Sequence, residues 1–547
     1  MVGDSDKLHW SVDSFTVRDG TLFAFGWLFH EDLAIRGIAV RATTGPHGEQ
    51  WRLTADHGKT REDVAHAFPA YATATHSGFV VVGSCWEVGT PISDLSLAAE
   101  AADGSVLAVQ IPLSSVRNFA DSGDGRDLAN PAFSQWTALA RRGLGLLRAG
   151  RFSILFEKMR RYLGGRPKAR ANDPSVPLRR ARASGASSYC LIVDHDLGGG
   201  ANQYREQLVS ERIAAGGAVA ILSYHLPTLS YKLALRGTGL DESYAVPGLD
   251  VVTELAQALP VSEVICNTAV SLARPQDIPP LLVALKEATG ARLLLMVHDF
   301  FMVCPSHFLL DAQGAFCGVP DESTCRVCLQ SNSYGFTSLF RERDIAVWRA
   351  QWGRALARAD EIRFFSEGTQ RWFRKAYPDC DFAHATVIPH AVDQLRFEKL
   401  QPTFTQALRI GVIGHIGYHK GASVVASLAE EIRRRGTPIQ IAVLGTIETY
   451  CDPAVLRETG AYKRDELPEL VRKFGVNVIL FPSICWETFS YVVQEAIELD
   501  LPVACFDLGA PAERLSGYEK GLVLKTRDPG LILDALIEFH HKIYPEG

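Results

Sequence analysis

The sequence lacks any long hydrophobic run: no stretch approaches the roughly 18 unbroken apolar residues that a membrane-spanning helix needs. It also begins without the basic and apolar stretches of a secretory signal. Cysteine is scarce, with 11 in 547 residues, which excludes a disulfide-built secreted scaffold. Neither charge sign dominates, because 56 basic and 62 acidic side chains leave a net charge of −6. These absences predict a cytoplasmic globular protein, and the length suggests three or four domains.

The charge is unevenly distributed along the chain. Residues 141–182 carry a net charge of +11, so the remainder carries −17. Apolar side chains accompany these arginines, which makes residues 132–182 a candidate contact with a membrane surface. A solvated linker is the simpler interpretation. We expect no nucleic-acid partner, because no recognisable module accompanies the charge.

Residues 1–115 are predicted to form short strands separated by turns. Two apolar runs flank Asp19 and Gly20, which suit a tight hairpin turn, and further strand-like runs follow. We predict an antiparallel β-sandwich that either docks an acceptor or partner or has a purely structural role. Aromatic side chains stack well on sugar rings. The candidates for this contact are Trp10, Trp27, Trp51 and Trp86.

After a basic helical linker over residues 116–186, unbroken apolar strands alternate with amphipathic helices. This alternation predicts two doubly wound, Rossmann-like α/β domains, over residues 187–395 and 396–547, the second ending in a helix. Ligands of such sheets bind at the carboxyl ends of the strands. After the first strand, Gly199 and Gly200 let a ligand approach the start of a helix. An ordinary strand-to-helix turn is the alternative.

The second α/β domain contains the residues that indicate chemistry. Its first strand enters a glycine-lined turn that starts at Gly414, and Lys420 stands before the next helix; backbone amides and an ammonium suit a pyrophosphate. Further along, Glu487 lies in a loop and Glu495 lies on a helix, so two carboxylates are available to the hydroxyls of one ligand. The helix-start amides that would face a phosphate belong to Thr488, Phe489 and Ser490.

Gly414, Lys420 and the two glutamates eight positions apart resemble the C-terminal domain of the retaining GT-B glycosyltransferases of family four. Residues 387–393, VIPHAVD, are similar to the segment that joins the two domains of that family. The resemblance implies a GT-B fold in which residues 187–395 lie on the acceptor side and 396–547 on the donor side. It also implies a nucleotide-sugar donor, a glycan or lipid-linked glycan acceptor and no cofactor for catalysis.

The resemblance implies a role for each matching residue. Glu487 orients the donor sugar, Glu495 binds the nucleotide ribose and Lys420 contacts the pyrophosphate. His298 stands where the family has a histidine that reaches toward the donor sugar, with a hydrogen-bonded core histidine as the alternative. Tyr462 falls where the family contacts the base, although an ordinary surface tyrosine fits as well.

One departure from the family pattern concerns the phosphate site. His415 stands where the family usually has an arginine, and a histidine is only partly charged at neutral pH. Phosphate binding is then either weaker or assisted by another cation, and Arg409 and Arg464 are the candidates.

Four cysteines lie close together in a long loop over residues 304–328 of the first α/β domain. A C-x2-C pair with two further thiols nearby is typical of a structural zinc site, with free or redox-labile thiols as the alternative. Four sulfur ligands leave no open position for a substrate, so such a zinc would not be catalytic. The residues are Cys304, Cys317, Cys325 and Cys328.

We therefore predict a retaining hexosyltransferase of cell-surface polysaccharide or O-antigen biosynthesis, cytoplasmic and peripheral on the inner face of the membrane. Two other functions stay open: a GT-B nucleotide-sugar epimerase, and a noncatalytic glycan-binding or scaffolding protein whose cleft has lapsed. The presence of both Glu487 and Glu495 argues against the scaffolding protein.

Overall fold

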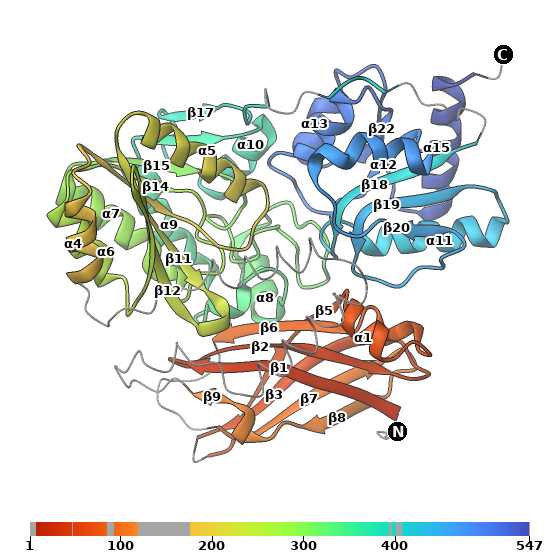
Figure 1. Ribbon diagram of the computed structural model, residues 1–547, viewed down its shortest axis with the longest axis horizontal. Helices are drawn as coiled ribbons and strands as arrows, with labels where there is room; N and C mark the ends of the chain where they lie inside the picture. The colour runs from red at the N-terminus through yellow and green to blue at the C-terminus, as the bar shows by residue number, and fades with distance from the viewer. Residues whose placement is uncertain are drawn as a thin grey trace.

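The computed structural model describes residues 7–45, 47–84, 92–118, 175–392, 397–400 and 407–545. Most of the predicted linker and membrane-surface segment, and also Trp86, lie outside these residues. An N-terminal β domain lies beneath two α/β domains that stand side by side (Figure 1). None of the helices in the described ranges is long and apolar enough to cross a bilayer.

The N-terminal domain consists of two sheets with strand orders β5-β6-β2-β1-β9 and β4-β3-β7-β8. Apolar side chains of both sheets, such as Phe15 and Leu97, form one core between them, as the predicted β-sandwich requires. Asp19 and Gly20, with φ of +50° and +70°, form the predicted hairpin turn. The strands are β1 (Leu8–Arg18), β2 (Thr21–His30), β3 (Ile35–Thr44), β4 (Glu49–Thr54), β5 (Asp56–Lys59), β6 (Gly78–Ser84), β7 (Ile92–Ala101), β8 (Val106–Gln110) and β9 (Arg117–Asn118), and helix α1 (Glu62–Ala67) precedes β6.

The first α/β domain is built on a sheet of order β13-β12-β11-β10-β14-β15-β16-β17. The strands from β11 to β17 in this order run parallel, whereas β12 and β13 add an antiparallel hairpin at one edge that the sequence analysis did not predict. The strands are β10 (Tyr189–Val193), β11 (Ala218–His225), β12 (Ser230–Gly237), β13 (Leu240–Val246), β14 (Val261–Cys266), β15 (Arg292–Met296), β16 (Glu361–Phe364) and β17 (Ala385–Val387).

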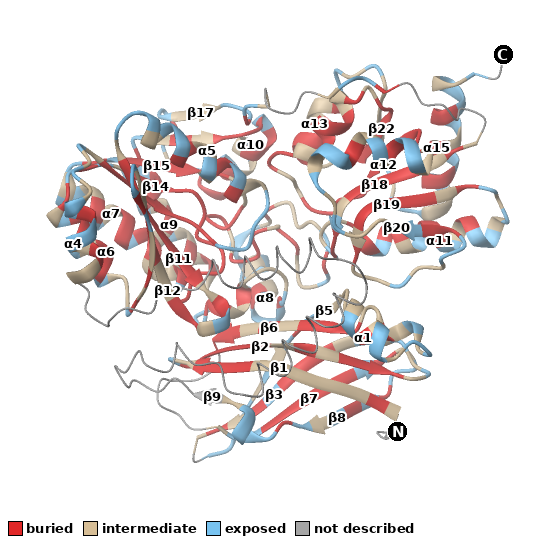
Figure 2. Ribbon diagram, in the orientation of Figure 1, coloured by how far each residue is buried: buried red, intermediate tan, exposed pale blue. Residues whose placement is uncertain are grey.

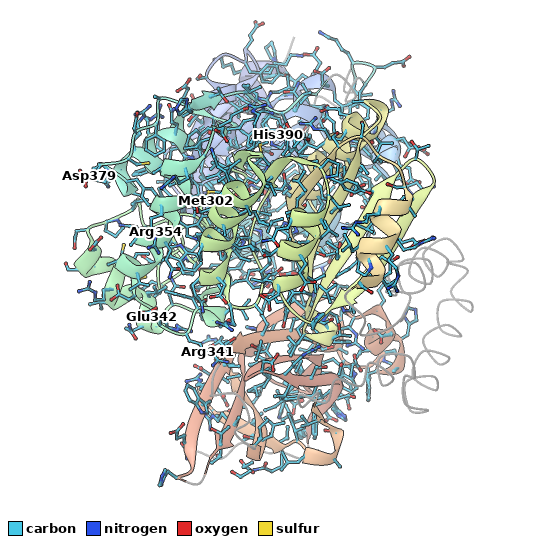
Figure 3. The ribbon with its side chains drawn as sticks, turned by 90° about the vertical axis from the view of Figure 1, so that its left-hand side faces the viewer. Met302, Arg341, Glu342, Arg354, Asp379 and His390 are labelled. Atoms are coloured by element: carbon cyan, nitrogen blue, oxygen red, sulfur yellow. The ribbon has the colours of Figure 1, made fainter. Side chains whose placement is uncertain are left out.

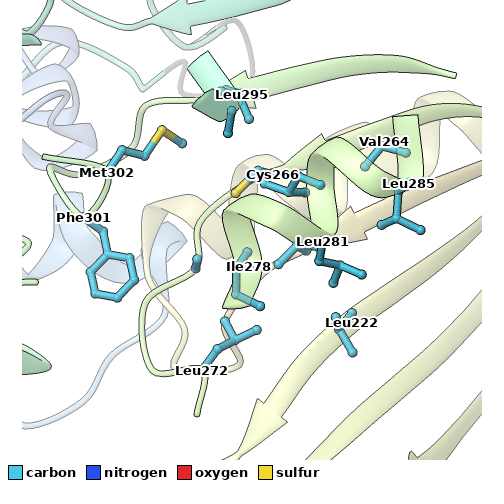
Figure 4. Packing of buried hydrophobic residues seen from close by; sticks show 14 of the residues in the cluster. Leu222, Val264, Cys266, Leu272, Ile278, Leu281, Leu285, Leu295, Phe301 and Met302 are labelled. Atoms are coloured by element: carbon cyan, nitrogen blue, oxygen red, sulfur yellow. The ribbon is translucent and has the colours of Figure 1, made fainter. Parts of the chain in front are cut away.

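Helices cover both faces of this sheet, with their apolar sides inward and their polar sides exposed (Figure 2). Figure 3 shows the same domain after a quarter turn, with Arg341 at its boundary with the β domain. In the core, Leu281 and Leu285 of α7 pack near Val264 of β14 (Figure 4). The helices are α4 (Ser175–Ala183), α5 (Gly200–Ala214), α6 (Asp250–Ala258), α7 (Ile278–Thr289), α8 (Glu322–Ser331), α9 (Ile345–Arg358) and α10 (Glu367–Ala376).

The last part of the predicted exposed linker is instead a docked helix, α4. Its residue Ala181 is fully buried in the core of the first α/β domain, and the Ala181 carbonyl accepts a hydrogen bond of 2.8 Å from the Tyr189 hydroxyl. The apolar residues of this helix are few and lie among arginines, so composition alone indicated an exposed segment.

The C-terminal domain has a six-stranded, wholly parallel sheet of order β20-β19-β18-β21-β22-β23. The order reverses between β18 and β21, where doubly wound sheets place their ligands. The predicted GT-B-like fold is thereby confirmed: two α/β domains, preceded along the chain by a β domain. The strands are β18 (Arg409–Ile416), β19 (Gln440–Ile447), β20 (Leu456–Glu458), β21 (Val478–Phe481), β22 (Val503–Phe506) and β23 (Gly521–Leu524), and the helices are α11 (Ala422–Arg435), α12 (Leu467–Phe474), α13 (Tyr491–Glu498), α14 (Gly509–Leu515) and α15 (Pro529–Ile543).

Candidate active site

The carboxyl ends of the two parallel sheets meet where the α/β domains contact each other. Thr488 follows β21, and His298 follows β15. The Thr488 hydroxyl donates a hydrogen bond of 2.7 Å to the His298 carbonyl. Gly200, the first residue of α5, lies so close to Tyr491, the first residue of α13, that a Cβ on it would be 3.2 Å from the Tyr491 ring. The predicted donor and acceptor sides therefore face each other across this contact.

Lys420 and Glu487 form the centre of the donor side. The Lys420 ammonium donates to Glu487 Oε1 at 2.6 Å, and the Ser483 hydroxyl donates to the same oxygen at 2.9 Å. Burial alone would lower the pKa of Lys420, but the neighbouring Glu487 carboxylate raises it above its usual value. The site therefore holds a fixed positive charge directly beside a carboxylate.

Glycine is required where the phosphate-type turn meets β21. Gly414 and Gly421 have φ of +110° and +86°. A Cβ on Gly421 would lie 2.0 Å from the carbonyl oxygen of Pro482, which no side chain tolerates. This close approach places Lys420 next to the loop that carries Glu487.

Glu495 occupies the second position predicted on the donor side. Ser490 caps α13 by accepting a hydrogen bond from the Val493 amide, and Glu495 lies in the same helix with 7% of its surface exposed. Arg464 Nε donates to Glu495 Oε1 at 2.6 Å. Burial raises the pKa of Glu495 and the Arg464 guanidinium opposes that rise. Tyr462 is a near neighbour of this pair, and burial raises its pKa as well.

The structure separates the two candidate helper cations. Arg464 lies beside Glu495, whereas Arg409 stands at the first residue of β18 and pairs with Gln440 at the first residue of β19. The phosphate-type turn follows the opposite, carboxyl end of β18. Arg409 is therefore at the wrong end of the sheet to assist it, and the helper role of Arg464 stays a prediction.

His415 is held by two partners that the sequence did not indicate. Its Nδ1 lies 2.7 Å from the Thr446 hydroxyl, and its Nε2 lies 2.7 Å from Glu448 Oε1. The side chain of Glu448 is only 5% exposed. The sequence offered one signal for Glu448, its position directly after β19. This is the carboxyl end of the sheet, where polar ligand contacts gather.

His298 lies at the contact between the domains, within a cluster of rings. Its Nε2 is 2.9 Å from Asn267 Oδ1, and its ring stacks on Phe365 with centroids 4.6 Å apart. The second histidine of the cluster, His390, belongs to the predicted joining segment and stacks on Phe489 with centroids 4.4 Å apart. Burial lowers the pKa of His298 well below its usual value, so His298 is neutral near pH 7. Its role toward a donor sugar stays a prediction.

The glycine turn of the first domain leads into a buried polar cluster that the sequence analysis missed. Gly199, with φ of +88°, precedes α5. Behind it, the fully buried Asp194 carboxylate accepts hydrogen bonds of 3.0 Å from Asn202 and from Arg205. These contacts fix the turn in place. The signal for this cluster in the sequence was that the first turns of α5 carry polar residues. Such residues resemble ordinary surface positions, so the signal was not recognised.

The structure gives no evidence for the predicted zinc site at the four clustered cysteines. Within the described residues, which include all four, no group of three or more potential ligands is arranged to hold a metal ion. Burial raises the pKa of Cys304, and raises that of Cys317 to about 11, so these sulfurs are neutral thiols. Cys325 Sγ instead faces the Arg349 guanidinium at 3.6 Å. The loop is held by other contacts, such as the bridge between Leu310 and Phe316 and a bond from Asn332 to the Leu310 carbonyl.

The three candidate tryptophans that the structure describes pack against apolar neighbours. Trp10 and Trp51 pack against the core of the sandwich, and Trp27 stacks on Phe29 with centroids 6.0 Å apart. Sugar stacking by these residues stays a prediction.

Comparison with known proteins found a family match in the C-terminal domain. Residues 396–542 match the family model of glycosyl transferases group 1, and no curated protein matches the chain. Among solved structures, the sucrose-phosphate synthase of Thermosynechococcus elongatus is 15% identical, with a TM-score of 0.44 over 64% of this chain and 89% of its own. HepE of Anabaena, in complex with UDP and glucose, is 13% identical, with a TM-score of 0.40 over 64% and 89%. WaaG, a glycosyltransferase involved in lipopolysaccharide biosynthesis, is 13% identical, with a TM-score of 0.38 over 66% and 95%.

The family match lies on the donor side of the site. The turn with Lys420 and the two glutamates all fall within residues 396–542. The predicted resemblance to a family of glycosyl transferases is thus confirmed for residues 396–542.

Proposed function

We propose that this glycosyltransferase moves a sugar, with retention at the anomeric carbon, from a nucleotide sugar to a glycan or lipid-linked glycan in cell-surface polysaccharide or O-antigen biosynthesis. The observation that supports the donor chemistry is a double ion pair at the carboxyl edge of one sheet. Lys420 pairs with Glu487, and Arg464 pairs with Glu495. A diphosphate attracts the cations, and carboxylates released from them accept hydrogen bonds from sugar and ribose hydroxyls.

In this proposal each group acts where charge develops. Lys420 and the free amides at the start of α13 bind the diphosphate as it leaves, while Glu495 holds the ribose and Glu487 the sugar. The bond between the anomeric carbon and the phosphate oxygen breaks, and a bond to the acceptor oxygen forms on the same face. The acceptor proton passes to the departing phosphate, so no protein base is required.

The acceptor and the pathway rest on the family resemblance. Contact between the two α/β domains excludes water from the reacting bond, and His298 is the polar group that the first domain contributes. We assign the reaction to the cytoplasmic side, with residues 132–182 as a candidate contact with the membrane surface.

The test is nucleotide release from a panel of UDP-, GDP- and ADP-sugars, with and without oligosaccharide or lipid-linked acceptors. We expect slow release of one nucleoside diphosphate without acceptor and faster release with it, and a product of unchanged anomeric configuration by NMR. Conversion of the donor into its epimer without nucleotide release would identify an epimerase instead. Binding of glycans by folded protein that turns over no donor would favour the noncatalytic alternative and refute the proposal.

A further inference from the structure

The N-terminal β domain is anchored to the first α/β domain by an apolar face. Phe23 of β2 is buried within the same core cluster as the sheet of that domain, and Phe25 and Val80 pack against it. Hydrogen bonds border this face, including one of 2.7 Å from the Ser338 hydroxyl to the Val82 carbonyl. Arg341, which Figure 3 shows at this boundary, donates to a carbonyl of the hairpin turn of the β domain. Because the contact is apolar and extensive, we expect the two domains to move as one body.

The same β domain also reaches the C-terminal domain, at the back of the phosphate-type turn. Strand β5, which lies just below the C-terminal domain in Figure 1, brings the Lys59 ammonium to 2.5 Å from Glu448 Oε1. The fit is close, since a Cβ on Gly58 would be 2.5 Å from the carbonyl oxygen of Glu448. The β domain therefore connects the two α/β domains, through an apolar face on one and an ion pair on the other.

Glu448 links this ion pair to the donor site. Its Oε1 accepts a hydrogen bond from the Lys59 ammonium and lies 2.7 Å from His415 Nε2. Because a carboxylate oxygen only accepts, this ring nitrogen carries a hydrogen and donates a hydrogen bond to Glu448. Its Oε2 lies against the phosphate-type turn, since a Cβ on Gly417 would be only 2.8 Å from this oxygen. Burial alone would raise the pKa of Glu448, but His415 and Lys59 hold it below its usual value. Glu448 is thus a buried negative charge whose ammonium partner comes from another domain.

We propose that Lys59 is a positioning residue of the donor site, which acts through Glu448 and His415. Its ammonium neutralises the Glu448 carboxylate and keeps that carboxylate where it orients the His415 imidazole beside the turn that receives the donor diphosphate. This inference rests on the proposed function. It gives the β domain a part in donor binding, whereas the acceptor docking considered from sequence stays a separate prediction.

The charge balance predicts what the loss of Lys59 does to nucleotide affinity. In Lys59→Met the buried carboxylate loses its ammonium partner and repels the diphosphate of the donor. One uncompensated charge beside the phosphate-type turn repels the diphosphate, and we expect nucleotide affinity to fall about 10-fold. The donor KM and the Kd of the nucleoside diphosphate rise together, while kcat and the acceptor KM stay within about 2-fold.

The experiment titrates UDP, GDP and ADP into the full-length wild type and its variants by calorimetry, and then measures donor kinetics. Lys59→Arg keeps the charge and should restore most of the affinity that Lys59→Met loses. Lys7→Met is the matched control, because Lys7 belongs to the same domain and pairs with Asp32 instead. In a Glu448→Gln background the effect of Lys59→Met should shrink to less than about 2-fold, because residue 448 then carries no charge to balance, and the second carboxylate that pairs with Lys59, Asp56 at 2.7 Å, lies largely in solvent.

A second pair of variants separates contact from general instability. Gly58 and Gly104 both have φ of +83°, so alanine introduces the same backbone strain at either position. Only Gly58 has a neighbour, since nothing lies within 4 Å of a Cβ on Gly104. We expect Gly58→Ala to weaken nucleotide binding. Gly104→Ala should leave nucleotide binding unchanged, although the same backbone strain lowers its thermal stability.

The outcomes distinguish this inference from the function beneath it. If the wild type binds no nucleoside diphosphate and uses no donor, the proposed function fails. If it binds and turns over a donor, but Lys59→Met and Gly58→Ala match the wild type in Kd and KM, the positioning role is wrong and the proposed function stands. Equal effects of Lys59→Met with and without Glu448→Gln would also overturn it.

Discussion

The ion pair between Lys420 and Glu487 allows a quantitative prediction about charge at the donor site. In Glu487→Gln the Lys420 ammonium loses the carboxylate at 2.6 Å, while its burial persists. Removing one member of a buried pair costs about 3 to 5 kcal/mol of folding free energy. Because the Lys420 side chain is 34% exposed, solvent screens part of this loss, and we expect about 1 to 2 kcal/mol.

The same variant should change how nucleotide binding depends on pH. A raised pKa means that the Lys420 charge is complete below that pKa and is lost only as the pH rises through it. The wild type therefore keeps the ammonium across the neutral and mildly alkaline range. In Glu487→Gln the carboxylate that raises the pKa of Lys420 is gone and burial still lowers that pKa, so the ammonium is lost at a lower pH than in the wild type. A charged hydrogen bond to phosphate is worth about 1.5 to 3 kcal/mol, or roughly 10- to 150-fold in affinity.

The assay is calorimetric titration of the nucleoside diphosphate that the wild type binds, at several values between about pH 7 and pH 9.5, a range in which an unpaired buried lysine titrates. We expect the affinity of Glu487→Gln to fall at least about 10-fold across this range, and that of the wild type to change much less. Lys420→Met serves as the control, because it lacks the titrating group and should bind weakly at every pH. Parallel pH curves for wild type and Glu487→Gln, with equal unfolding temperatures, would refute the reasoning.

Three further predictions concern other parts of the molecule. Glu495→Ala should reduce donor kcat/KM by roughly 10- to 150-fold, because it loses the ribose contact, and full activity in a folded variant would contradict the assignment. Overnight treatment with EDTA should leave the thermal unfolding curve unchanged, because the four cysteines do not gather around one metal position; a lowered unfolding temperature that zinc restores would contradict this. A chain that starts at residue 175, and so keeps the docked helix α4, should aggregate or bind nucleotide more weakly than the full chain, because it exposes the apolar face that Phe23 and Val80 cover and lacks Lys59; equal solubility and equal Kd would show that the β domain is dispensable.

The sequence was sufficient for features that local patterns encode. Alternating and unbroken apolar runs distinguish the sandwich from the parallel sheets, since strand burial on one or two faces is visible within a few residues. The spacing from Glu487 to Glu495 sets one carboxylate in a loop and one on the following helix, and the structure places them so. Glycine at residues 414 and 421 likewise meets a local need for positive φ.

Only the tertiary structure decided which side chains meet across domains. Lys59 and Glu448 are 389 positions apart, and each resembles an ordinary surface charge in the sequence. Phe23 and Val80 fit an alternating strand equally well whether their face meets solvent or another domain. The cysteines have metal-like spacing, but within the described residues no group of three or more potential ligands is arranged to hold a metal ion. Spacing along the chain fixes what one element presents, whereas partners are chosen by how whole faces dock, and docking depends on the summed burial of residues from distant segments.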